Sequence, residues 1–368
     1  FGVTTEGNHE GHNTLRLVEA LPELAARHKM TPAALMSRLR QVTEKLAFAR
    51  AKRKPLIRDD KVLTGWNALM VRALAEAATV LHEPRYAQGA VRIQRFIMNE
   101  LGGKEGNLKR VYFDGASSLQ ATQADYAFVG LAAVALYDVT RDKRWLDDAE
   151  RLAEVMYDLF ADPTKGGLFL TTEKTGFTRT KEIDDSTIPS GNGAALELFA
   201  LLNNRSQNVR WQQRALALKG VLSGIAVAEP LSHAATLLAA DILARGEAGS
   251  SQSAAHGALQ LVAMRMPDNR TARIRITIAP SWHINSISPK QDFLIPTKLD
   301  APGIVQGAIA FPEPVERRLG FHDEALSLYE GVADIRIRLP NGPAGLEARE
   351  VVLDLQACSD RVCLDPQK

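Results

Sequence analysis

Cysteine is scarce in this chain, and long uncharged apolar runs are missing. Of 368 residues only 2 are cysteine, Cys358 and Cys363, and both lie near the end. The net charge is +2 with 24% charged residues, so nothing in the composition indicates a nucleic acid or an acidic partner. No stretch of about 18 apolar residues is free of charge, so we expect no membrane span.

A signal-like N-terminus is also missing, but the chain begins with Phe1 rather than Met. We therefore expect the chain to be a fragment whose true N-terminus lies elsewhere. Any targeting signal would be lost with that N-terminus, so the missing signal says little about location. His9 and His12 could be metal ligands, although the neighbouring glycines argue against a helix that would pair them. Thr31 and Pro32 predict a helix start, as N-cap and first helical residue.

Three stretches are almost entirely apolar and have the length of a helix. They are Asp59–Leu81, Asp125–Tyr137 and Ser190–Leu202. A surface helix shows one polar face, so we expect these three to be buried on both sides. A fourth stretch, Ser232–Ala244, resembles them, and its His233 is either a cap or a ligand.

Each of the first three stretches is followed by an amphipathic helix that carries an aromatic residue near its start: Tyr86, Trp145 and Trp211. The repeat is therefore a long helical hairpin with a buried inner helix and a half-exposed outer helix. Such hairpins suit an α/α toroid, in which the ends of the inner helices line a cavity. The loop Pro163–Asp185 alternates apolar residues with threonine and predicts a short β-hairpin over the mouth of that cavity.

Polar and aromatic residues at the starts of the inner helices are the candidates for ligand binding in this cavity. They are Asp60, Lys61, Trp66, Asn67, Asp125, Tyr126, Asp185, Ser190 and Asn192. Arg179, in the predicted β-hairpin, is a further candidate. The alternative is that these residues are helix caps and core aromatics.

After residue 245 the pattern changes from helix to strand. Residues 246–254 (GEAGSSQSA) are small and predict a linker. Three later stretches alternate apolar with polar residues: ARIRITIAPSW, VADIRIRLP and AREVVLDLQA. We therefore predict a mostly helical protein with residues 1–245 in a partial toroid and residues 255–368 in an antiparallel β-sandwich.

Three motifs in the helical region, GNHEGHNTL, RAKRKPLIRDDKVLTGWNALM and RTKEIDDSTIPSGNGAA, resemble the YyaL-type thioredoxin-domain proteins. This resemblance implies a thioredoxin-like domain followed by an (α/α)6 toroid like those of sugar epimerases and six-hairpin glycosidases. The present chain would hold only part of the toroid, as an open arc with exposed apolar surface. The family typically reads Glu-Asp-Tyr-Ala where this chain has Ala124-Asp125-Tyr126-Ala127, so Asp125 and Asp185 remain as acid/base candidates.

Two motifs in the last part, SWHINSISPKQDFLIPTKL and LQACSDRVCLDP, are similar to the N-terminal periplasmic domain of the thiol:disulfide interchange protein DsbD. The resemblance implies an immunoglobulin-like sandwich that passes electrons through one cysteine pair, here Cys358 and Cys363. No helix start surrounds the pair, so it would act as an acceptor or relay for a thioredoxin-like partner. The alternatives are a structural disulfide and, less favoured, half of a zinc site.

The sequence therefore supports three hypotheses. The first is thiol–disulfide exchange by the sandwich, which places the protein outside the cytoplasm, in the periplasm, although the toroid alone would allow a cytoplasmic location. The second is a toroid that binds or modifies a carbohydrate, with Trp66 and Tyr126 stacking on the sugar beside Asp60, Asp125 and Asp185. The third is a binding scaffold without chemistry. None of them requires a cofactor or a resident metal.

Overall fold

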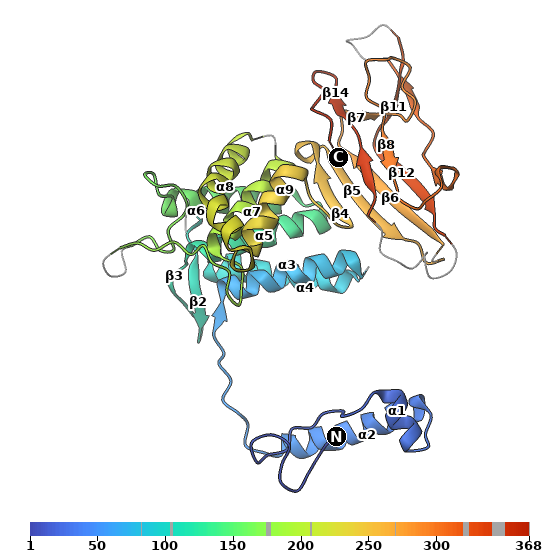
Figure 1. The fold of residues 1–368 in the computed structure, drawn as a ribbon. Helices are drawn as coiled ribbons and strands as arrows, with labels where there is room; N and C mark the ends of the chain where they lie inside the picture. Colours follow the sequence, from blue (N-terminus) through green and yellow to red (C-terminus); the bar gives the residue numbers. More distant parts are fainter. Residues whose placement is uncertain are drawn as a thin grey trace. The chain divides into compact units, whose positions relative to one another are not determined.

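The computed structural model describes residues 1–81, 83–103, 106–173, 178–206, 208–268, 270–318, 324–340 and 350–367 (Figure 1). The chain divides into two compact units, Phe1–Asp60 and Lys61–Lys368. The predicted helical region, residues 1–245, therefore contributes to both units. No helix of the described residues is long and apolar enough to cross a bilayer.

The first unit contains α1 (Leu21–Arg27) and α2 (Pro32–Ala51). The hydroxyl of Thr31 accepts a hydrogen bond from the backbone N–H of Ala34 at 3.2 Å, which confirms the predicted N-cap of α2. His9 and His12 pair through two backbone hydrogen bonds of 2.9 Å in a tight turn. A small apolar cluster around Leu24 and Leu35 holds α1 against α2.

The second unit begins with the predicted helical hairpins. The inner helices are α3 (Thr64–Val80), α5 (Gln123–Thr140), α7 (Gly191–Arg205) and α9 (Ala234–Arg245). The outer helices are α4 (Pro84–Phe96, continued by the π-helix η1, Ile97–Leu101), α6 (Lys143–Phe160) and α8 (Arg210–Ala228). Each inner helix packs on the next, and α4, α6 and α8 each pack on the inner helix before them. The result is an arc of α/α hairpins, so the predicted partial toroid is confirmed.

The prediction that every inner helix is buried on both sides is wrong for α3. Helices α5 and α7 have inner helices on both sides, and nearly all their residues are buried. Among the inner helices, α3 packs on α5 and α9 packs on α7, so each keeps one open face. Trp66, Met70 and Val80 of α3 and Leu238 of α9 are exposed. This agrees with the apolar exposure expected of an open arc.

Short strands and one buried ion-pair network complete the helical part. Strands β1 (Val62–Leu63), β2 (Lys109–Phe113) and β3 (Ala116–Gln120) form an antiparallel sheet. The fully buried guanidinium of Arg205, in α7, donates to the carboxylates of Asp138 in α5 and Glu247 beyond α9. Burial alone would lower its pKa, but the two carboxylates outweigh burial and raise it.

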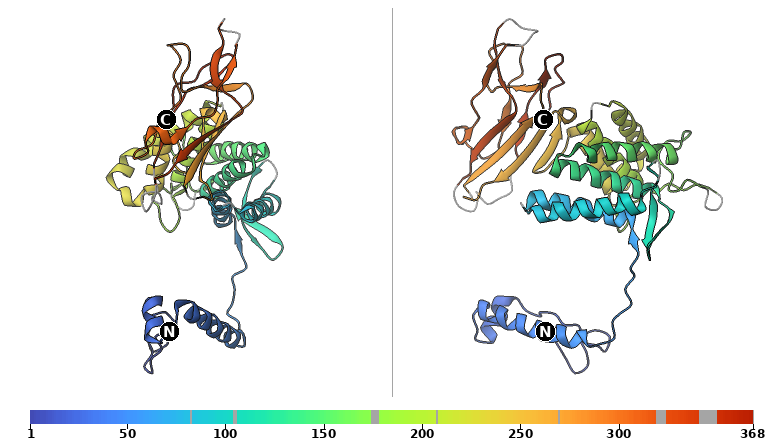
Figure 2. Two further views of the ribbon diagram at one scale, coloured as in Figure 1. Left: turned by 90° about the vertical axis from the view of Figure 1, so that its right-hand side faces the viewer. Right: turned by 180° about the vertical axis from the view of Figure 1, so that it is seen from behind.

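The rest of the unit is a β-sandwich, which Figure 2 shows from two further sides. One sheet has the order β4 (Ser251–Ala254), β5 (Leu259–Arg265), β6 (Thr271–Ile278), β12 (Val332–Arg338) and β9 (Ile309–Ala310). The other has the order β10 (Val315–Arg317), β11 (Leu326–Tyr329), β7 (Trp282–Asn285) and β14 (Ala357–Ser359). Strand β13 (Val352–Asp354) pairs with β8 (Lys298–Asp300), and short 3-10 helices lie at Pro230–Ser232 (η3), Ala255–Gly257 (η4) and Gln306–Ala308 (η5). All described strand pairs are antiparallel, as predicted.

The alternation read in the sequence defines the core between the two sheets. Ile274, Ile276 and Ile278 of β6 are buried, while the residues between them are not. They pack in one cluster with Ile284 of β7 and Ala357 of β14, which belong to the other sheet. The buried face of each sheet therefore points toward the other, as in a sandwich.

Two local predictions need correction. Residues 251–254, assigned to the linker, form the edge strand β4 by pairing with β5. In the loop Pro163–Asp185, the predicted turn at residues 174–176 lies outside the described residues, and no strand is found in the described parts of the loop. Instead one backbone hydrogen bond, from Leu170 N to Thr180 O at 2.8 Å, joins its two arms.

Candidate functional site

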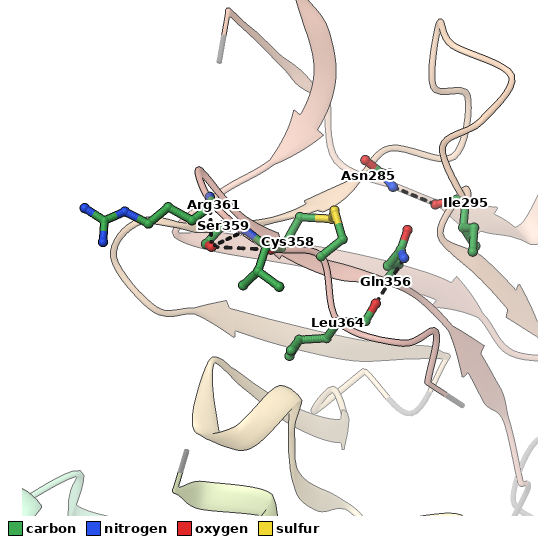
Figure 3. The surroundings of a disulfide bond; sticks show 9 residues. Asn285, Ile295, Gln356, Cys358, Ser359, Arg361 and Leu364 are labelled. Carbon is green, nitrogen blue, oxygen red and sulfur yellow. Dashed lines mark hydrogen bonds between the residues drawn. A yellow bond between two sulfur atoms is a disulfide. The ribbon is translucent and has the colours of Figure 1, made fainter. Parts of the chain in front are cut away.

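Cys358 and Cys363 form a disulfide at the end of the sandwich (Figure 3). Cys358 lies in β14, and the chain folds back so that Cys363 pairs with it in an antiparallel bridge. Their Cα atoms are 4.0 Å apart, which is closer than the roughly 4.4–6.8 Å that is usual for disulfides. The pair thus lies on a β-hairpin and not at a helix start, in agreement with the prediction.

The turn between the cysteines is held by its own polar groups. Ser359 N donates to Val362 O at 2.8 Å, and the hydroxyl of Ser359 accepts from Arg361 N and Val362 N. On the side of the disulfide away from the turn, Leu364 N donates to Ala357 O, and the amide of Gln356 donates to Leu364 O at 3.0 Å. Figure 3 shows the hydrogen bonds of the Ser359 hydroxyl and the bond from Gln356 to Leu364. The hairpin therefore has hydrogen bonds of its own on both sides of the disulfide.

The strand register places the disulfide on the outer face of its sheet. In β14, Ala357 pairs with Ile284 of β7, and both belong to the core between the sheets. Cys358 pairs with His283, the next residue along. Because successive side chains of a strand point to opposite faces, Cys358 and His283 point away from the core between the sheets.

The two cysteines differ in exposure. Cys358 is 1% exposed, whereas Cys363 is an exposed residue. An attacking thiolate must approach a sulfur directly, so access decides which sulfur of a disulfide reacts. Of the two cysteines, Cys363 is therefore the one that is accessible from solution, and Cys358 is not.

His283 is the nearest titratable neighbour that the strand pairing assigns to the disulfide, and the sequence analysis missed it. Side chains directly opposite in an antiparallel pair have Cβ atoms about 4.5–5.5 Å apart. The imidazole is 2% exposed, and burial lowers its pKa, although the carboxylates of Glu330 and Asp360 act in the opposite direction. The imidazole beside Cys358 is therefore neutral near pH 7.

The segment after β7 covers part of the same outer face. Leu294 packs on Leu326 and Leu328 of β11 in a small buried cluster. The amide of Asn285 donates to Ile295 O at 2.9 Å, and the hydroxyl of Thr297 donates to Asn285 O at 2.6 Å. The motif SWHINSISPKQDFLIPTKL is thus the strand that pairs with the cysteine strand, together with the loop that covers its outer face.

In the helical arc, Asp125 is a cap that joins two inner helices. Its Oδ2 accepts from the backbone N–H and the hydroxyl of Thr122, both at 2.8 Å, in a capping box at the start of α5. Arg110 donates to the same oxygen at 2.7 Å, and Gly65 N in α3 donates to Oδ1 at 3.0 Å. A Cβ at residue 65 would lie 2.7 Å from Oδ1 of Asp125, so any larger residue there would displace this carboxylate.

Asp185 makes the equivalent link between α7 and α9. Its Oδ1 accepts from Ser190 N and its Oδ2 from Ala235 N, both at 2.8 Å. Between these two links, the amide of Gln123 in α5 donates to Gly191 O in α7 at 2.9 Å. Carboxylates are stabilised at helix N-termini by the unpaired N–H groups and the helix dipole. The starts of the four inner helices are therefore tied together by polar side chains.

Four other candidates have structural partners. Ser190 caps α7 by accepting from Gly193 N, and the amide of Asn192 binds the backbone of Leu168 and Glu182. Tyr126 is buried, and its hydroxyl accepts from Leu108 N at 2.8 Å; burial raises its pKa. Arg179 donates to Thr171 O and Leu159 O and lies 4.0 Å from the ring centroid of Phe169. These contacts support the alternative of caps and core aromatics, and a role in ligand binding stays a prediction.

The remaining candidates lie near the start of α3. Trp66 is 62% exposed, and the amide of Asn67 donates to Leu63 O at 2.9 Å. Lys61 is exposed as well. Asp60 pairs with Arg58 and belongs to the first compact unit, so its place beside the others stays a prediction. The structure thus brings Asp125 to the start of α3, and Asp185 to the starts of α7 and α9.

Comparison with known proteins separates the two halves of the chain. Residues 253–368 match the family described as thiol:disulfide interchange protein DsbD, N-terminal. The match covers the whole sandwich except the start of β4. It includes both cysteines and His283.

The helical part is similar to spermatogenesis-associated protein 20. The rat protein is 28% identical over 224 residues, which cover 58% of this chain and 28% of the relative. An uncharacterized protein of Caenorhabditis elegans, B0495.5, is 25% identical over 239 residues, covering 61% of this chain and 32% of the relative. The matched region thus spans about a third or less of these relatives.

Solved structures with a similar arrangement include two carbohydrate-active proteins. A cellobiose 2-epimerase from Bacillus thermoamylovorans B4167 has a TM-score of 0.39 at 17% identity, over 45% of both chains. A family 76 glycoside hydrolase from a bovine Bacteroides thetaiotaomicron strain has a TM-score of 0.39 at 15% identity, over 44% of this chain and 35% of the other.

We expect Asp125→Ala to destabilise the helical arc by roughly 2–4 kcal/mol, since it removes a cap and leaves buried donors without an acceptor. The measurement is urea unfolding of the whole chain, followed by far-UV circular dichroism. The matched control is Asp158→Ala on the exposed face of α6, which should change stability by less than about 0.5 kcal/mol. Equal stability of Asp125→Ala and the control would show that the carboxylate is not needed as a cap.

We expect His283 to titrate below its ordinary pKa of 6.5, because burial disfavours the imidazolium. The unfolded state then binds more protons than the folded state just below pH 6.5, so stability should fall as the pH falls through that window. The direct measurement is an NMR titration of this imidazole in the folded chain. A measured pKa at or above 6.5 would contradict the proposed dominance of burial.

Proposed function

We propose that the sandwich exchanges electrons with a thioredoxin-like partner through Cys358 and Cys363. The observation that carries this proposal is the unequal exposure of the two cysteines on the outer face of a sheet. A purely structural disulfide has no need of an exposed sulfur, whereas exchange requires one sulfur that a partner can reach. The match of residues 253–368 to the DsbD N-terminal family supports the same reading.

The exchange proceeds in two substitutions. A thiolate of the reduced partner attacks Sγ of Cys363; the disulfide breaks, and Cys358 leaves as a thiolate that takes up a proton. The partner's second thiolate then attacks the partner's first sulfur, which is bonded to Cys363 in the mixed disulfide. This step releases Cys363 as a second thiolate, which is also protonated. The partner ends as a disulfide and this chain as a dithiol, so two electrons and two protons have moved. The reverse sequence passes them on to an oxidised acceptor.

We further propose an extracytoplasmic location, because disulfides of this kind persist in oxidising compartments. The helical arc, by its similarity to spermatogenesis-associated protein 20, supports membership of the YyaL-type group, and its role beside the sandwich is that of a scaffold. A carbohydrate function is not favoured by any contact described above, since the carboxylates of Asp125 and Asp185 are engaged at helix starts. It stays a prediction.

The proposal is tested by trapping the mixed disulfide. The oxidised chain is mixed with a reduced thioredoxin whose second active-site cysteine is replaced by serine, then quenched with acid and digested for mass spectrometry. We expect the thioredoxin to be linked to the peptide that contains Cys363, because that residue is exposed and Cys358 is not. The control is the chain with both cysteines replaced by serine.

Linkage mainly to Cys358 would contradict attack at Cys363, and no linkage under conditions in which the thioredoxin reduces a small disulfide would contradict the exchange itself. In the second case the disulfide would be a structural bond of the hairpin. The direction of transfer is then read by repeating the reaction with reduced chain and oxidised thioredoxin.

A further inference from the structure

One buried histidine in the helical arc lies against two carboxylates from other segments. Asp184 belongs to the loop before α7, Glu229 is the C-cap residue of α8, and His233 is the N-cap residue of α9. One ligand atom from each lies within 4.8 Å of the other two. The neighbouring Asp185 fixes the loop, because its N–H donates to Ser232 O at 2.7 Å and its carboxylate accepts from the start of α9.

The two ring nitrogens of His233 differ in their hydrogen bonding. It is 0% exposed, and Nδ1 lies 2.9 Å from the backbone oxygen of Glu229. A carbonyl only accepts, so Nδ1 carries the hydrogen, and in the neutral ring the lone pair is on Nε2. Among the described residues Nε2 finds no hydrogen-bond partner, although Oδ1 of Asp184 is 3.2 Å away. In the neutral form of the ring, a buried lone pair would therefore face a carboxylate.

Two lone-pair donors at this distance repel each other unless a positive charge lies between them. A divalent metal ion supplies that charge, and its histidine ligands commonly donate their other N–H to a backbone carbonyl, as Nδ1 does here. The carboxylates of Asp184 and Glu229 would balance a 2+ charge. The C-terminal end of α8, at Glu229, adds the negative end of a helix dipole.

We propose that Asp184, Glu229 and His233 form a binding site for a divalent transition-metal ion of the zinc type. One imidazole nitrogen and two carboxylate oxygens are a donor set that zinc accepts. Asp184 is 67% exposed and Glu229 is an exposed residue, so both side chains can close on the ion. Three protein ligands leave coordination positions for water or a ligand from solution. The site is independent of the disulfide.

The competing arrangement is a doubly protonated His233 that forms a simple ion pair with Asp184. It needs no metal, and it predicts that zinc neither binds at this position nor stabilises the chain. The two arrangements are separated by zinc binding itself, measured with zinc chloride as the probe.

The experiment is isothermal titration of zinc into the full chain with its disulfide intact, in a His9→Ala/His12→Ala background. This background removes the other histidine pair, and the intact disulfide removes thiolate ligands. We expect one zinc ion per chain and a zinc-dependent rise in melting temperature. Asp184→Asn and Glu229→Gln should each weaken binding by at least about tenfold, as loss of a ligand should exceed the effect of an outer partner.

The matched control is Asp241→Asn, a partly exposed aspartate of α9 that pairs with Arg245; the affinity of this variant for zinc should be unchanged. Because Asp184 and Glu229 are exposed, their variants should fold even if His233→Ala does not. No saturable binding, or binding that Asp184→Asn and Glu229→Gln leave unchanged, would overturn the proposal and leave the ion pair.

Discussion

The register between β14 and β7 is the constraint on which the proposed chemistry depends. Ala357 opposite Ile284 fills the core between the sheets, so Cys358 opposite His283 must point outward. A slip of one residue would reverse every side chain of the strand and move the sulfur into the core. Burial of Ala357 and Ile284 therefore fixes the face on which the disulfide lies, and the hairpin turn decides that Cys363 is the exposed member.

Polar side chains at the starts of the inner helices hold the helical arc together. The inner helices are nearly apolar, and they meet at their N-termini, where four N–H groups of each helix lack partners in the helix. Asp125 and Asp185 each accept from two neighbouring helix starts, and Gln123 links the helices between them. Polar residues at these positions align the helices, which accounts for their presence without any ligand.

The sequence predicted the helical hairpins and the sandwich well, because both rest on periodicity. The isoleucines of β6 alternate with residues that are less buried, as expected for a strand with one buried face. The apolar residues of α5 form a nearly continuous run, and nearly all of them are buried. Residues 251–254 escaped prediction, since Ser-Gln-Ser-Ala has no strand preference and becomes a strand only by pairing with β5. The open face of α3 was missed too, because a run of apolar residues does not say how many neighbours a helix has.

The site was predictable in part. The cysteine pair was evident from the sequence. The face of the sheet on which it lies depends on the register between β14 and β7, and this register cannot be read from a single stretch of sequence. Whether Asp125 is a cap or an acid could not be decided without knowing that Gly65, 60 residues earlier, donates to it. The group of Asp184, Glu229 and His233 comes from three segments, so only the fold brings it together.

The most direct test of the central claim is the reduction potential of the Cys358–Cys363 disulfide. The chain is equilibrated in graded glutathione buffers, its free thiols are trapped, and the reduced fraction is measured by mass spectrometry. Exchange with a thioredoxin-like partner predicts a potential between about −120 and −270 mV, the range of thiol–disulfide exchange proteins. A potential below about −300 mV is typical of structural disulfides and would contradict a role in electron transfer.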